Sequence, residues 1–134
     1  MRASLELRFQ VSQRASGRCE YCLIHERDAA FAHEVDHVIS RQHGGSDEFG
    51  NLAFACLFCN RCKGTNVGSI GPSGKLVRLY NPRTDRWDAH FQLEGSVIQP
   101  STPEGAATAR LLRFNDRERV IERDLLQRLG RYPR

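Results

Sequence analysis

Four cysteines fall into two closely spaced pairs, Cys19 with Cys22 and Cys56 with Cys59. Two sulfurs three positions apart can bind one ion from a single turn, and two such turns supply the four thiolates of a tetrahedral zinc site. A site of this kind has no open coordination position, so we expect a structural zinc whose binding energy contributes to folding. The alternative is four unrelated buried or free thiols, and the doubled spacing favours zinc.

A second group of polar residues lies in the long segment between the two cysteine pairs. Asp36 and His37 are adjacent, Asn51 follows later in the segment, and Asn60 comes directly after Cys59. Histidine titrates near neutral pH and can take a proton from water. Carboxylate and amide oxygens are ligands that suit Mg²⁺ or Mn²⁺. Together these residue types fit metal-assisted hydrolysis, although a lone Asp–His pair is more often a surface or structural contact.

In their order and spacing these residues resemble the HNH endonucleases, and most closely the McrA-like bacterial subgroup with four zinc-binding cysteines. The resemblance covers roughly residues 18–65 and includes the ending Asn60-x-x-Lys63-Gly64. It implies that His37 is the general base and that Asn51 orients it. It also implies that Asp36 and Asn60 bind the catalytic divalent cation. Many members have histidine in place of Asn60, so the choice between Mg²⁺ and Mn²⁺ stays open.

The resemblance implies an endonuclease that hydrolyses DNA phosphodiester bonds to 5′-phosphate and 3′-hydroxyl ends. Two other classes remain open: a non-catalytic zinc-ribbon module that binds nucleic acid or protein, and a zinc-stapled structural protein that binds no nucleic acid. The complete polar set argues against a pure binding module, which has no need of it. A double-strand break requires two cuts, which suggests either a dimer or two successive nicks.

The composition is mildly basic, with a formal net charge of +4 and a pI of about 9.0. This balance permits a nucleic-acid partner without requiring one. Arg41, Arg61 and Lys63 flank the polar residues, and we predict that they contact phosphates; ordinary solvated charge is the alternative. The arginine-rich segment 110–134 is either a DNA tether or a helical cover with a solvated outer face, and we favour the cover.

No apolar run reaches the length of a membrane span, and Arg2, Glu6 and Arg8 interrupt the apolar residues at the N-terminus. We therefore expect no membrane span, no secretory leader and a cytoplasmic location. In a reducing compartment the cysteines are expected to bind metal or stay free rather than form disulfides.

The elements that position these residues are predicted to form an α+β fold. Strands within 29–39 and 52–55 and a short helix within 56–65 would make a ββα-metal core. Residues 4–17 favour a helix capped by Ser4 over a strand. We divide the chain into a nuclease core, 1–70, and an accessory hairpin and helical tail, 71–134, packed on it.

The accessory half is predicted to begin after a linker or irregular loop over residues 67–74. A small antiparallel meander would follow, with strands at 76–80, 87–93 and 97–99. Helix-start signals occur at Thr102-Pro103 and at Asn115. In the last helix the apolar residues recur every fourth position and predict a face packed on the core, formed by Ile121, Leu125 and Leu129.

Overall fold

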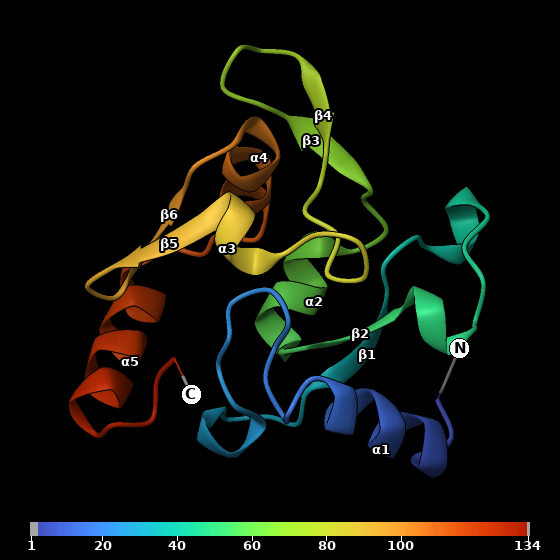
Figure 1. The fold of residues 1–134 in the computed structure, drawn as a ribbon, viewed down its shortest axis with the longest axis horizontal. Coiled ribbons are helices and arrows are strands. Elements are labelled where there is room, and N and C mark those ends of the chain that lie inside the picture. Colours follow the sequence, from blue (N-terminus) through green and yellow to red (C-terminus); the bar gives the residue numbers. More distant parts are fainter. Residues whose placement is uncertain (1–2, 134) are drawn as a thin grey trace.

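The computed structural model describes residues 3–133, which fold as an α+β protein and confirm the predicted fold class (Figure 1). The strands of this part of the chain form three separate two-stranded antiparallel sheets. None of its helices is long and apolar enough to cross a membrane.

The first helix, α1 (Leu5–Arg14), begins at Ser4, whose Oγ accepts a hydrogen bond from the Leu7 amide at 3.1 Å. The helical interpretation of this stretch is therefore confirmed over the strand. Val11 is fully buried and packs with Leu52 and Phe54 of the second strand. Helix α1 thus covers one face of the hairpin formed by β1 (Glu34–His37) and β2 (Leu52–Ala55), as Figure 1 shows.

The central unit consists of β1 (Glu34–His37), β2 (Leu52–Ala55) and α2 (Leu57–Lys63), and the helix packs on both strands. In the antiparallel register Asp36 lies opposite Ala53 and His37 opposite Leu52. Successive strand residues point to opposite faces, so Asp36 faces α2 while His37 shares the face of Val35. The predicted ββα arrangement is present. Three short 3-10 helices surround it: η1 (Glu26–Asp28), η2 (Arg41–His43) and η3 (Phe49–Asn51).

The accessory half differs from the predicted meander. Strand β3 (Gly68–Ile70) occupies the segment expected to be a loop and pairs with β4 (Leu76–Arg78). A tight turn explains this, since the Gly71 amide donates to the Lys75 carbonyl at 2.8 Å and Gly74 adopts a φ of +84°. Backbone pairing, rather than an apolar side-chain pattern, makes this hairpin, so the sequence did not reveal it.

The expected strand over 87–93 is also only partly correct. Its first residues form the one-turn helix α3 (Trp87–His90). Strand β5 (Phe91–Glu94) then pairs with β6 (Val97–Pro100), as the meander predicted, but it does not pair with β4. The Trp87 indole donates to the Tyr21 carbonyl at 2.8 Å, which draws this turn onto the first cysteine pair.

Two helices end the chain: α4 (Pro103–Leu111) and α5 (Arg117–Arg128). Thr102 caps α4 as predicted, because its Oγ1 accepts from the Gly105 amide at 2.9 Å. The start predicted at Asn115 is wrong by one residue, since Asp116 precedes α5. The Asn115 amide instead exchanges two hydrogen bonds with the backbone of Ile98, at 2.9 and 2.8 Å.

The predicted apolar face of α5 does not pack on the core. Ile121, Leu125 and Leu129 are 48%, 56% and 68% exposed. The helix instead buries two arginines, Arg119 and Arg123, which are 8% and 2% exposed. Hydrogen-bond acceptors supplied by the rest of the fold make this reversal stable, as described below.

One apolar core connects the two halves of the chain. Tyr80, Phe91, Ile98 and Phe114 pack in the same cluster as the cysteine pairs. The boundary expected between residues 70 and 71 falls within the β3–β4 hairpin, and the core extends across it.

Candidate metal centre and catalytic site

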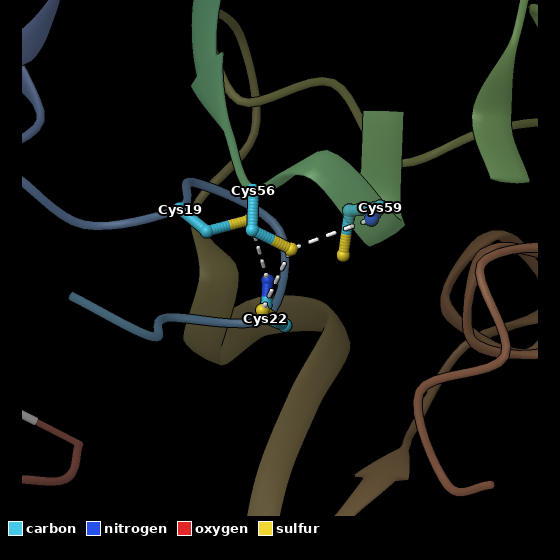
Figure 2. A group of neighbouring side chains, drawn as sticks. All are labelled: Cys19, Cys22, Cys56 and Cys59. Atoms are coloured by element: carbon cyan, nitrogen blue, oxygen red, sulfur yellow. Dashed lines mark hydrogen bonds between the residues drawn. The ribbon is translucent and has the colours of Figure 1, made fainter. Parts of the chain in front are cut away.

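The four paired cysteines converge on one point. Figure 2 shows Cys19 and Cys22 on the loop that follows α1, with Cys56 at the end of β2 and Cys59 on the first turn of α2. Their sulfur atoms all lie within 4.8 Å of one another, and all four residues are buried. Among residues 3–133 this is the sole group of three or more His, Cys, Asp or Glu side chains arranged to hold a metal ion.

Each pair sits in a turn that points backbone amides at sulfur. The Cys22 amide donates to Cys19 Sγ at 3.4 Å, and the Cys59 amide donates to Cys56 Sγ at 3.3 Å. Across the pairs, Cys22 Sγ lies 3.8 Å from Cys56 Sγ. Tetrahedral Zn²⁺ with bonds of about 2.3 Å requires sulfurs about 3.8 Å apart. The donor set and its spacing fit a structural zinc.

The protonation of these thiols depends strongly on burial. Burial raises the pKa of the Cys19 and Cys59 thiols well above the ordinary value, whereas hydrogen bonds with neighbouring sulfurs hold the pKa of Cys22 well below it. Cys19 and Cys59 therefore keep their protons near neutral pH unless a cation displaces them. Binding of Zn²⁺ would release these protons, so acid would favour loss of the metal.

Asp36 is held between two donors in the interior. The Tyr21 hydroxyl donates to Oδ2 at 2.7 Å, and the Lys63 ammonium donates to Oδ1 at 3.2 Å and to the His37 carbonyl at 2.9 Å. Asp36 is 4% exposed and Lys63 is 2% exposed. Burial raises the Asp36 pKa, although Lys63 and the Tyr21 hydrogen bond act in the opposite direction.

Two rows of side chains meet between β1 and α2. Glu34 and Asp36 point to one face of the strand because they are two residues apart, and Asn60 and Lys63 share one face of the helix because they are three apart. The Asn60 Nδ2 donates to Glu34 Oε1 at 2.8 Å, next to the Lys63–Asp36 pair. This bond fixes the amide with its Oδ1 free of hydrogen bonds from residues 3–133.

His37 lies on the opposite face of β1, beside the ion pair formed by Asp47 and Arg41. The Nε2 of His37 is 2.8 Å from Asp47 Oδ1. The Arg41 guanidinium donates hydrogen bonds to both oxygens of the same carboxylate, at 2.8 and 2.6 Å. Hydrogen bonds from Arg41 and then from His37 hold the Asp47 pKa well below its usual range. Asp47 therefore stays ionised at every pH at which a nuclease would be assayed.

Asn51 ties together the loop that follows His37. Its Oδ1 accepts from the Ile39 amide at 3.0 Å, and its Nδ2 donates to the carbonyls of Ile39 and Ser46 at 2.9 and 2.7 Å. These bonds hold the ends of the segment that contains Arg41 and Asp47. The link from Asn51 to His37 thus runs through the loop rather than through direct contact.

The structure brings the predicted residues into one region but not into one hydrogen-bonded group. Asp36 and Asn60 lie between β1 and α2, while His37 and Asn51 lie on the loop side of β1, and no hydrogen bond joins the side chains of His37, Asp36 and Asn60. The expected phosphate contacts differ in accessibility. Lys63 is buried against Asp36, contrary to the expectation of an exposed cation, and Arg41 is engaged by Asp47, whereas Arg61 is exposed.

Tyr21 and Asp47 of this region went unassigned from sequence, whereas the position of Glu34 left open a group that supports Asp36 or a merely exposed residue. Glu34 had a readable signal, because a residue two before Asp36 on a strand shares its face. Asp47 lies in a glycine-containing loop whose path no periodicity determines, and Tyr21 sits between two cysteines. Only the tertiary structure shows that these last two reach His37 and Asp36.

Comparison with known proteins identifies the type of domain. Residues 19–66 match the family model described as HNH endonuclease, and residues 67–134 lie outside the match. No curated protein and no solved structure matches the chain. Residues 19–66 therefore carry an HNH endonuclease domain, a domain of the nuclease type, built around four cysteines positioned to bind metal.

Proposed function

We propose that the protein is a metal-dependent HNH endonuclease that hydrolyses DNA phosphodiester bonds to 5′-phosphate and 3′-hydroxyl ends. The observation that carries the proposal is the contact between His37 Nε2 and Asp47 Oδ1 inside a segment that matches the HNH family. A histidine oriented by a carboxylate is the arrangement that general-base catalysis needs.

The Asp47 contact assigns the proton of the neutral ring. A carboxylate only accepts hydrogen bonds, so His37 carries its proton on Nε2 and presents the lone pair of Nδ1. Nδ1 takes a proton from water as the water oxygen attacks phosphorus in line. The resulting imidazolium is stabilised by Asp47, which Arg41 holds in place through two hydrogen bonds.

Asp36 and Asn60 are the residues that would hold Mg²⁺ or Mn²⁺. Carboxylate and amide oxygens suit a hard divalent cation, and the Glu34 contact leaves Asn60 Oδ1 available. Both Asp36 oxygens accept hydrogen bonds, from Tyr21 and Lys63, so the cation would replace the Lys63 ammonium at Oδ1. When bound, the cation would stabilise charge on the phosphate and on the departing 3′ oxygen. Lys63 neutralises Asp36 and binds the His37 carbonyl, which fixes the end of β1 relative to α2.

The remaining expectations belong to the same proposal. DNA is the substrate, Arg61 is an exposed candidate for phosphate contact, and a double-strand break arises from a dimer or from two successive nicks. We place the activity in the cytoplasm, because four zinc-binding cysteines and one further thiol, Cys62, suit a reducing compartment.

Plasmid nicking by the zinc-loaded protein tests the proposal. Wild type and His37→Ala are compared with Mg²⁺, with Mn²⁺ and after dialysis against metal-free buffer, because EDTA would also remove zinc. His43→Ala is the matched control, since His43 is an exposed histidine in the neighbouring η2 helix. We expect the wild type and His43→Ala to nick DNA only with added metal, and His37→Ala to be inactive.

The products separate the mechanism from its alternatives. End labelling should find 5′-phosphates, and 3′-phosphates would contradict the in-line mechanism. If the zinc-loaded wild type binds but cuts no supercoiled, linear or single-stranded DNA, the protein is a non-catalytic binding module. If it binds no DNA at low salt, the zinc-stapled structural protein is the correct class.

A further inference from the structure

A buried arginine of the C-terminal helix reaches the cysteine cluster. Arg119 Nη2 lies 3.1 Å from Cys59 Sγ and 3.8 Å from Cys56 Sγ. Its Nη1 donates to the Leu112 carbonyl at 2.7 Å, and the guanidinium stacks over the Phe58 ring at 4.4 Å. The side chain is therefore fixed on several sides and directs a charged donor at two sulfurs.

Among residues 3–133 no carboxylate lies at ion-pair distance from Arg119, and this residue is only 8% exposed. Burial of an unpaired charge is strongly unfavourable. Four thiolates around one Zn²⁺ carry two excess negative charges, and these sulfurs are the groups that Arg119 contacts. Arg119 thus offsets one of the two excess negative charges of the loaded metal site, and the site in turn offsets the buried charge of the arginine.

Other contacts from the accessory half reach the first cysteine pair. The Tyr132 hydroxyl donates to the Cys22 carbonyl at 2.7 Å. The Trp87 indole donates to the Tyr21 carbonyl within the same turn. Both cysteine turns are therefore held by residues that lie outside the segment matching the HNH family.

We propose that Arg119 is a positioning residue of the zinc site, which offsets part of the negative charge of the zinc–thiolate cluster by a charge-assisted hydrogen bond. Groups around the ligands of a metal commonly change its affinity about 10- to 100-fold. The C-terminal tail thereby becomes part of the metal centre rather than a separate appendage.

Matched substitutions on α5 test this role. Arg119→Met removes the charge and the donors. Arg123→Met removes an equally buried arginine whose partners are the Ser96 carbonyl and the Asn115 amide oxygen, at 2.8 and 3.0 Å. Arg117→Met removes an exposed charge from the first turn of the same helix. Arg119→Lys retains a positive charge and a hydrogen-bond donor. It keeps the test informative if Arg119→Met fails to fold.

The readouts are zinc affinity, from competition with a chromogenic chelator, and the sulfur-to-metal charge-transfer band of the Co²⁺-substituted protein. Helix content is measured in parallel by circular dichroism. We expect Arg119→Met to lower zinc affinity about 10- to 100-fold and to shift the band, with Arg119→Lys between it and the wild type. Arg123→Met and Arg117→Met should retain the wild-type affinity and band.

Two results would overturn the proposal. One is a wild-type zinc affinity and charge-transfer band in Arg119→Met. The other is an equal loss of zinc in Arg119→Met and Arg123→Met at equal helix content, which would show that the metal responds to the packing of α5 alone. Neither readout depends on nuclease activity, so failure of the proposed function leaves this test intact.

Discussion

Replacement of Lys63 by methionine should destabilise the protein by about 3–5 kcal/mol near pH 8, because it leaves one partner of a buried ion pair without the other. The magnitude follows from the burial of both groups, 2% and 4% exposed, and from the 3.2 Å contact between Lys63 Nζ and Asp36 Oδ1. Methionine retains most of the side-chain volume, so cavity formation adds little. The loss should therefore report the uncompensated Asp36 carboxylate.

The pH dependence gives the loss a recognisable sign. Burial already raises the Asp36 pKa in the folded protein, and Lys63 acts against that rise. Without Lys63 the folded-state pKa should rise further above the unfolded value. Such a group favours the folded state below its unfolded pKa, and this contribution disappears as pH rises through the folded pKa. Lys63→Met should thus come closer to the wild type as pH falls from 8 to 5.

Urea unfolding of the zinc-loaded protein at several pH values, without added Mg²⁺, measures both effects. Lys75→Met is the control, because Lys75 is the other lysine of the chain and is exposed. The double variant Asp36→Asn/Lys63→Met should recover part of the loss, since no buried charge remains. A Lys63→Met protein as stable as Lys75→Met, or a loss that does not change with pH, would refute this reasoning.

Three further outcomes are expected. Asp47→Asn should slow nicking about 10- to 100-fold, because the carboxylate that orients the His37 ring is gone; a wild-type nicking rate would exclude a positioning role. Asn51→Ala should cost about 1–3 kcal/mol, with faster hydrogen exchange in the 39–51 loop, since three hydrogen bonds are lost. Cys59→Ser, or removal of zinc, should abolish the cooperative thermal transition while Cys62→Ser should retain it, because Cys62 lies outside the four-sulfur group; a retained transition without zinc would show that the metal is not needed for folding.

Residue patterns over short stretches of sequence predicted the central ββα unit and the cysteine site correctly. The two cysteine pairs bring their sulfurs together because each spacing closes within one turn. Strand β2 follows its short apolar run, and β1 lies within residues 29–39, where a strand was predicted. Ser4 and Thr102 cap their helices because an N-cap depends on residues only a few positions away.

Pairing between distant segments was predicted less well. The β3–β4 hairpin arises from a backbone turn in a segment of few apolar residues. The pairing of β5 with β6 was predicted, but the expected pairing of β4 with β5 is absent, because β4 pairs with β3. Which strands pair depends on how well each candidate strand packs against the rest of the fold. The residue pattern of one strand does not contain that information.

The sequence by itself determined the four-cysteine site, the ββα unit and the set of polar residues that fits HNH chemistry, because each rests on residue type and short spacing. Only the tertiary structure decided that Asp47 holds His37, that Lys63 is buried against Asp36, and that α5 turns Arg119 rather than Ile121 inward. An apolar pattern in a helix predicts which face is buried only from the free energy of moving apolar side chains out of water. It takes no account of polar partners elsewhere in the fold. Sulfurs supplied by distant segments gave the arginine partners that no local pattern contains.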